Sequence, residues 1–412
     1  MNKLDIYTVY YMDYNDRDDV MKYEATGSVK SEKIFPVYGD YIFKPLSRTK
    51  PLTTPLFAYS EVFWSYFIGK YFEENAPRYY LAKCSNIDRD IPKYYPIGTL
   101  VKKVTNENQK LVNLLQYFNS HPLENIDISD YVNFCEKLYD YREILNAPIF
   151  KKRVDLREKL ENQILLSILK EDENFHYENV SFIEEDGNII DLCPTLDSEF
   201  SSFFLYPEKR EMRDFRKFVL RDSLDVPFSL PEDKIEKAKK LLRFQLKTSL
   251  INIITILIKD PEVVISFSEK IDKLINEIEN IDEIYMNYNF FDGLNSDSWK
   301  IGAARFKNNN EDSARVLETY IKESKLDSNL FNERLKNELL DSFRNLKFNL
   351  EILIILYKND CLKESDSEIK YPTVRQALEI KGLDISEEEF NNLTALDKLD
   401  LINTKEKQKI MI

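Results

Sequence analysis

Residues with the chemistry of a magnesium site flank a short hairpin pattern within residues 172–199, DENFHYENVSFIEEDGNIIDLCPTLDSE. Asn179 precedes and Asp197 follows two apolar runs that EEDGN joins, so a tight turn would bring both residues to one edge of a sheet. Amide and carboxylate oxygens suit a hard cation such as Mg²⁺, and magnesium on a triphosphate is what phosphoryl transfer to a hydroxyl requires. Two alternatives stay open, because Asn179 could simply open a strand and Asp197 could cap the next helix.

Two charged residues earlier in the chain could complete such a site. Lys44 ends a strand-like run, YIFKPL, from which its ammonium could reach the α- and β-phosphates of a nucleotide. Glu61 lies among apolar residues in AYSEVFWSYF. A carboxylate in such surroundings needs a partner or a path to solvent, and an ion pair with Lys44 would satisfy both groups. The alternatives are an ordinary strand-edge lysine and a glutamate at the rim of the core.

Two further features of the sequence have a structural and a functional interpretation. His176, one of two histidines, could act as a general base, but we favour a role in bracing its loop by hydrogen bonds. Gly27 and Ser28 open the run GSVKS, which could cover a phosphate with backbone N–H groups. A plain β-turn is the simpler interpretation of a single glycine.

The pattern of elements predicts an α+β protein. β-Branched and aromatic residues indicate strands through residues 1–45, and again at 76–84 and 94–104. Apolar spacing predicts a helix over 56–73. From 107 onward the i, i+3, i+4 pattern predicts helices at 108–118, 130–145, 157–170, 231–258, 261–281 and 329–357, interrupted by the hairpin at 180–192.

These elements predict two lobes of the kind found in protein kinases. We expect a small β-rich N-terminal lobe at 1–106, a larger, mainly helical C-terminal lobe at 107–361, and a small helical tail at 362–412. The ligand of such a two-lobed protein would lie in the cleft between the lobes.

Composition narrows the class of partners. The net charge of −14 argues against direct nucleic-acid binding and against attraction to an anionic membrane. The basic run at 151–159 is either a local patch or a solvated helix face.

Four dispersed cysteines and two histidines argue against a structural zinc site and favour a reducing compartment. The first residues lack a signal-peptide pattern, and the longest apolar run, LINIITILI, is too short to span a bilayer, so we expect a cytoplasmic protein.

In the order FKP, YSEVF, APRYYLA, ENFHYEN and PTLDSEFS, the chain resembles the HipA-like serine/threonine kinases, which are bacterial toxin–antitoxin kinases distantly related to phosphoinositide kinases. The resemblance covers about residues 24–260. It implies that Lys44 binds ATP, that Glu61 is its helix partner, and that Asn179 and Asp197 hold Mg²⁺. It also places a regulatory serine near Ser28 or Ser31.

The catalytic loop departs from the pattern of that family, D-x-H-x-x-N. The matching residues here run from Asn174 through His176 to Asn179, so Asn174 stands where the family has its catalytic aspartate. Either Asp172, two residues upstream, takes that position, or Asn174 orients the hydroxyl while metals and positioning supply the catalysis.

Three functions therefore follow from the sequence. The first is an ATP- and Mg²⁺-dependent kinase with a protein substrate. The second is a pseudokinase that binds nucleotide without transfer. The third is a helical interaction protein. An antitoxin or another regulatory protein would be the expected partner for the first two.

Overall fold

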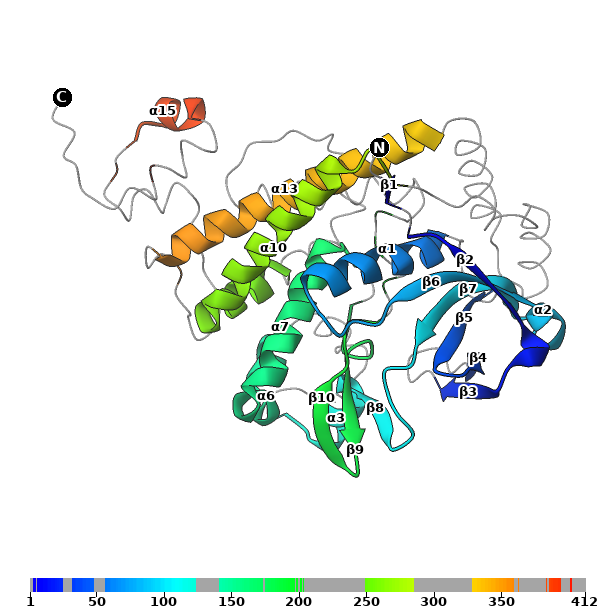
Figure 1. Ribbon diagram of the computed structural model, residues 1–412. Coiled ribbons are helices and arrows are strands. Elements are labelled where there is room, and N and C mark those ends of the chain that lie inside the picture. The colour runs from blue at the N-terminus through cyan, green and yellow to red at the C-terminus, as the bar shows by residue number, and fades with distance from the viewer. Residues whose placement is uncertain are drawn as a thin grey trace, which may run out of the picture. The chain divides into compact units, whose positions relative to one another are not determined.

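The computed structural model describes residues 3–4, 6–24, 32–47, 56–123, 141–172, 175–196, 198, 201, 203, 249–284, 328–358, 362, 383, 385–393 and 401. Strands dominate the N-terminal region and helices the later part (Figure 1). This confirms the predicted α+β class.

A six-stranded sheet forms most of the N-terminal region. Its strand order is β2-β6-β7-β5-β4-β3, in which β2 and β6 are parallel and the other neighbours are antiparallel. Strands β5 and β6 each bury apolar side chains, including Phe43 and Leu46 of β5 and Leu81 and Ala82 of β6. The strands are β2 (Val9–Asp13), β3 (Asp19–Glu24), β4 (Glu32–Tyr38), β5 (Tyr41–Ser47), β6 (Tyr79–Ser85) and β7 (Tyr94–Lys102).

Helix α1 (Leu56–Tyr71) packs on β6 and β7 and is apolar around most of its circumference. Its residues from Phe57 to Phe67 are buried except Tyr66. A helix that is apolar on nearly every side must be surrounded by protein, so its one internal carboxylate, Glu61, is buried with it. The predicted helix at 56–73 is confirmed.

The predicted hairpin is also present. Strands β9 (Ser181–Glu185) and β10 (Asn188–Leu192) are joined by Asp186 and Gly187, whose φ angles are +50° and +80°. Two consecutive residues with positive φ form the turn that matches the twist of a two-residue hairpin, and Asp-Gly is a favoured sequence for it.

A third strand in this small sheet corrects the helix predicted at 108–118. Residues Gln109–Asn113 form β8, which pairs antiparallel with β9, and only Leu114–Ser120 form a helix, α3. Asn113 starts α3 with a capping box, in which its side chain accepts from the Gln116 N–H while the Gln116 side chain accepts from the Asn113 N–H. Leu111 and Val112, the apolar residues before this cap, lie in β8 and pair with β9.

The later part of the chain is helical. Helices α7 (Val154–Leu169), α10 (Pro261–Asn280) and α13 (Ser328–Lys358) confirm three predicted helices, and residues 249–259 are helical as well. Lys336 of α13 donates to the carbonyls of Glu279 and Ile281, so these ends of α13 and α10 lie together (Figure 1). The predicted helix at 130–145 is described only from residue 141 onward. Shorter elements are β1 (Lys3–Leu4), β11 (Glu283–Ile284), η1 (Tyr14–Asp16), α2 (Ile87–Asp90), α5 (Arg142–Leu145), α6 (Pro148–Lys152) and α15 (Glu387–Asn392).

The chain divides into two compact units. The first contains residues 1–130, 166–210 and 273–341, and the second contains residues 131–165, 211–272 and 342–412. The six-stranded sheet, the three-stranded sheet and α1 belong to the first unit. The borders predicted from the sequence, at 106/107 and 361/362, stay a prediction. Within the described residues, no helix has both the length and the apolar character needed to cross a membrane.

Candidate functional site

Lys44 and Glu61 form a largely buried ion pair. The Lys44 ammonium donates to Glu61 Oε1, and the two side chains are 18% and 2% exposed. Thr99 Oγ1 donates to the other carboxylate oxygen of Glu61 at 2.7 Å. The ion pair predicted from the sequence is therefore confirmed, while the role of Lys44 toward a nucleotide stays a prediction.

The register of the large sheet explains this arrangement. Lys44 on β5 lies directly opposite Thr99 on β7. Because paired residues share one face of a sheet, both side chains point toward the same side, and their common partner is Glu61 of α1. Burial of a single carboxylate is costly without partners, so the three residues form a unit.

Gly98 is required where β5 and β7 approach each other. A Cβ atom on Gly98 would lie 2.0 Å from the carbonyl oxygen of Lys44 and 2.8 Å from the Cα of Pro45. These are backbone atoms, so the strand itself would have to move. The pairing also shifts register between Pro45 and Ser47, next to this contact.

We expect Gly98→Ala to push β5 away from β7 and to displace Lys44. The free energy of unfolding, measured by urea denaturation, should fall by about 1–3 kcal/mol, the range for overpacking in a close-packed interior. Gly39→Ala is the matched control, because nothing lies within 4 Å of the Cβ that Ala would add there. Its φ of +58° still makes that change mildly unfavourable. An effect of Gly98→Ala no larger than that of the control would contradict the steric argument.

The residues on either side of Asp197 hydrogen-bond to α1 or to the loop that follows it. Thr195 donates from its N–H and its hydroxyl to the two carboxylate oxygens of Glu73, at 2.8 and 2.9 Å. Ser60 of α1, the neighbour of Glu61, donates its hydroxyl to the carbonyl oxygen of Ser198. Asp197 itself lies outside the described residues, so the predicted metal ligand is not placed.

Lys170, which the sequence analysis did not identify, is buried next to the candidate catalytic loop. Its side chain is 1% exposed and its ammonium lies 2.9 Å from Asp172 Oδ2, whose side chain is 3% exposed. The ammonium also donates to Ser198 Oγ at 3.0 Å, and Ser201 donates to the Lys170 carbonyl at 2.7 Å. Lys170 therefore joins Asp172 to the residue that follows Asp197.

His176 and Asn179 lie in one tight turn. The Asn179 N–H donates to the His176 carbonyl at 2.8 Å, and the Glu178 N–H donates to His176 Nδ1 at 3.3 Å. These local bonds are the kind expected of a bracing residue, although the role of His176 stays a prediction. Burial raises the pKa of the Glu178 carboxyl. Asn174, Gly27, Ser28 and Ser31 lie outside the described residues.

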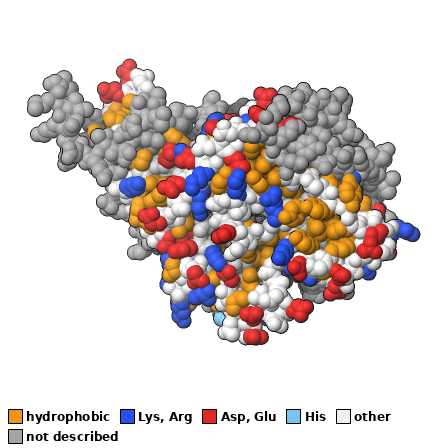
Figure 2. Space-filling model, viewed as in Figure 1, with side chains coloured by type: hydrophobic (Ala, Val, Ile, Leu, Met, Phe, Trp, Pro, Cys, Tyr) orange, Lys and Arg blue, Asp and Glu red, His pale blue; other side chains and the backbone are white. Residues whose placement is uncertain are grey.

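A cavity of about 450 Å³ opens at the end of the large sheet, beside the β9–β10 hairpin. It does not include Lys44 or Glu61. Its charged lining residues are of both signs: Glu74, Arg78, Lys102, Lys103 and Asp191. Mixed charge also characterises the face of the molecule in Figure 2, where acidic and basic side chains are interspersed. Among the described residues, no group of three or more His, Cys, Asp or Glu side chains could hold a metal ion.

Sequence reasoning found Lys44 and Glu61 but missed Thr99, Lys170, Glu73 and Ser60. Thr99 has an available signal, because a polar residue inside the apolar strand YYPIGTLVK needs a partner. The sequence gives no such signal for Lys170. A lysine at the C-terminal end of a helix is ordinarily exposed, and its positive charge interacts favourably with the helix dipole there.

Comparisons with known proteins show a distant similarity to solved structures. No family model and no curated protein matches the chain. Among solved structures, one described as the crystal structure of a Helicobacter pylori proinflammatory kinase, CtkA, is similar at 14% sequence identity. The match covers 75% of this chain and 98% of that chain, with a TM-score of 0.37.

Proposed function

We propose that this protein is an ATP- and Mg²⁺-dependent serine/threonine kinase of HipA-like type, which transfers the γ-phosphoryl group to a protein hydroxyl. The observation that carries the proposal is the Lys44–Glu61 ion pair, with Thr99 on the second carboxylate oxygen. A lysine fixed by a buried carboxylate has little conformational freedom, which suits a residue that binds phosphates. Its 18% exposure leaves part of the side chain accessible to a ligand.

The proposal also assigns residues to the magnesium ion and to the phosphates. Asn179 and Asp197 would hold the magnesium ion, which when bound would offset the charge of the triphosphate. Two contacts support this role: Thr195 donates to Glu73 in the loop after α1, and the Ser198 carbonyl accepts from Ser60 of α1, which also carries Glu61. Gly27 and Ser28 would cover the phosphates with backbone N–H groups.

In the transfer step, the bond between the γ-phosphorus and its bridging oxygen breaks and a bond to the substrate hydroxyl oxygen forms. ADP leaves with the bridging oxygen, and the hydroxyl proton passes to a carboxylate or to water. Either Asp172 would be that carboxylate, or Asn174 would orient the hydroxyl while metals and positioning supply the catalysis.

A second candidate function is a nucleotide-binding module without transfer. It is favoured by the state of Asp172, which is 3% exposed and paired with Lys170, while Asn174 replaces the catalytic aspartate of the family pattern. Such a module would act through a partner such as an antitoxin or another regulatory protein.

Transfer of phosphate from labelled ATP, to the protein itself or to proteins of a lysate, tests the two candidates. For an active kinase, we expect Lys44→Met and Asp197→Ala each to lower the rate about a hundredfold, as loss of one positioning or charge-stabilising group does. Lys110→Gln, which removes an exposed ion pair with Glu184, is the control and should keep the wild-type rate.

The outcomes separate the proposals. Full transfer by Asp197→Ala would overturn the kinase assignment. No transfer by the wild type, together with a Mg²⁺- and Lys44-dependent rise in melting temperature on adding ATP, would support the nucleotide-binding module. No response to ATP at all would reject both.

A further inference from the structure

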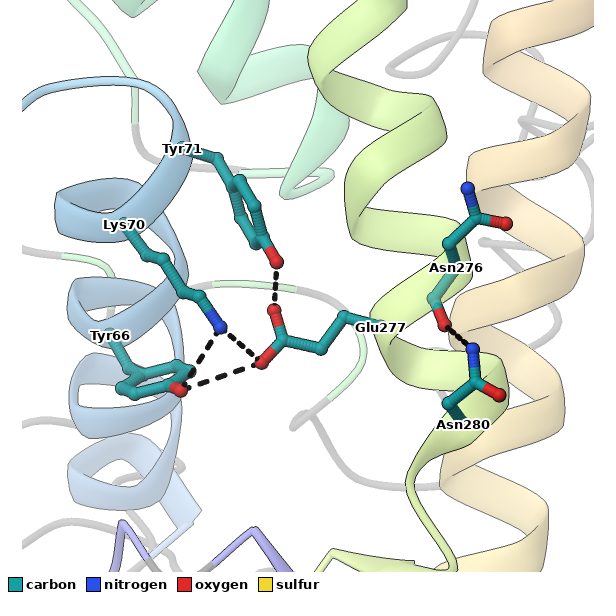
Figure 3. Close-up of polar contacts among 6 residues, drawn as sticks. All are labelled: Tyr66, Lys70, Tyr71, Asn276, Glu277 and Asn280. Carbon is teal, nitrogen blue, oxygen red and sulfur yellow. Dashed lines mark hydrogen bonds and ion pairs between the residues drawn. The ribbon is translucent and has the colours of Figure 1, made fainter. Parts of the chain in front are cut away.

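Helix α1 is attached to α10 by one carboxylate that three side chains contact (Figure 3). The ammonium of Lys70 donates to Glu277 Oε1 at 2.6 Å, and the Tyr66 hydroxyl donates to the same oxygen at 3.4 Å. The Tyr71 hydroxyl donates to Glu277 Oε2. Glu277 is the only residue in this group outside α1. We refer to Tyr66, Lys70, Tyr71 and Glu277 as the Glu277 clamp.

Lys70 and Tyr71 of the clamp both hold their protons more tightly than usual, because the pKa of each is raised. Burial lowers the pKa of Lys70, but the hydrogen bond and negative charge of Glu277 outweigh this and raise it. Burial raises the pKa of Tyr71, and Glu277 raises it further. The Lys70 ammonium also lies over the rings of Tyr66 and Tyr71, 5.5 and 5.2 Å from their centroids. The clamp thus combines the Lys70–Glu277 ion pair with two aromatic rings.

The location of the clamp matters because α1 also carries Glu61. Lys70 follows Glu61 by nine positions, which corresponds to about 14 Å along a helix. Most of the remaining surface of α1 is apolar, and apolar packing is non-directional. It therefore resists separation of the helix from the sheet more than it resists sliding or rotation. Hydrogen bonds and ion pairs have a preferred direction and distance, so they fix the position that packing leaves adjustable.

We propose that Glu277 is a positioning residue that holds α1 where Glu61 meets Lys44, and that it thereby sets the affinity of the protein for the phosphates of ATP. The inference rests on the proposed function for its ligand, but the effect on α1 can be measured separately. Glu277 contacts side chains of α1, so its action passes through α1 and Glu61.

Glu277→Gln is the test variant, because it keeps the size of the side chain and removes the charge that Lys70 contacts. Hydrogen exchange of the α1 amides is the first measurement. We expect their protection to fall in Glu277→Gln, while far-UV circular dichroism stays unchanged. Lys110→Gln, which removes an exposed ion pair elsewhere in the same unit, should leave α1 protection at its wild-type level.

The second measurement is the affinity for MgATP. We expect Glu277→Gln to raise the dissociation constant or KM about fivefold, within the range for a residue coupled to a site it does not touch. The value of kcat should change less, because the chemical groups themselves remain. Lys70→Met should weaken ATP binding similarly, and the double variant Lys70→Met/Glu277→Gln should be no worse than either single variant if both act through one contact.

The outcomes are distinguishable from failure of the proposed function. If wild-type protein does not bind ATP but α1 protection falls in Glu277→Gln, the proposed function fails and the control of α1 by the clamp stands. If wild type binds ATP and Glu277→Gln changes neither α1 protection nor ATP affinity, the positioning role is wrong. Additive effects of Lys70→Met and Glu277→Gln would also overturn it.

Discussion

Replacing Lys170 with methionine is expected to lower the free energy of unfolding by about 3–5 kcal/mol, the usual result of removing one partner from a buried ion pair. Methionine fills nearly the same volume, so packing changes little. Stability falls because the Asp172 carboxylate, which is 3% exposed, and the Ser198 hydroxyl both lose their contact with the Lys170 ammonium. Urea denaturation followed by circular dichroism measures the change.

Two companion variants make this result interpretable. Lys170→Met/Asp172→Asn removes both charges, and we expect it to recover a large part of the lost stability because no uncompensated charge then remains buried. Lys110→Gln removes an exposed ion pair of similar length, 2.7 Å, from a lysine that is 68% exposed. It should change stability by about 1 kcal/mol or less. A Lys170→Met protein as stable as the Lys110→Gln control would show that the buried pair contributes nothing.

The sequence predicts the parts of this structure that depend on local chemistry. The EEDGN turn predicts the hairpin because Asp-Gly adopts the two positive φ angles that a two-residue turn requires. The Lys44–Glu61 pair is predictable for a different reason. A carboxylate in the middle of an apolar helix must find a cation, and Lys44 lies at the end of the preceding strand-like run.

The parts that depend on distant pairing could not be predicted in this way. Leu111 and Val112 fit the apolar spacing of the helix that follows, and only their pairing with β9, about seventy positions later in sequence, makes them a strand. Lys170 is similar: its position at a helix end predicts exposure, whereas its burial depends on Asp172 and Ser198. Such choices are decided by tertiary contacts, which override local preference.

The second large effect concerns pH and a buried carboxylate in the second unit. Glu161 of α7 is fully buried, with Arg157 Nε 3.6 Å from its Oε1. Arg157 also donates to Asp260 at 2.8 Å. Burial, and then the neighbouring Asp260 carboxyl group, raise the pKa of Glu161 to about 9, while Arg157 opposes them and Glu158 adds a small increase.

The sign of the effect on stability follows from the two pKa values of Glu161. Its pKa is about 9 in the folded protein and 4.5 as the ordinary value. Between these values the folded protein binds the proton more tightly than the unfolded chain does. The stabilisation from this proton is therefore complete below the unfolded pKa and is lost as pH rises toward the folded pKa, by about 1.4 kcal/mol for each pH unit.

Glu161→Gln should abolish this dependence, because glutamine keeps the shape of the protonated acid and never ionises. From about pH 5.5 to about pH 8, the stability of the variant should increase relative to wild type by about 3 kcal/mol. Urea denaturation at a series of pH values measures it. Glu158→Gln, an exposed residue of the same helix, is the matched control and should follow the wild-type curve. Parallel stability curves for Glu161→Gln and wild type over this range would contradict the prediction. They would mean that Glu161 is ionised in the folded protein and that its negative charge is offset by Arg157.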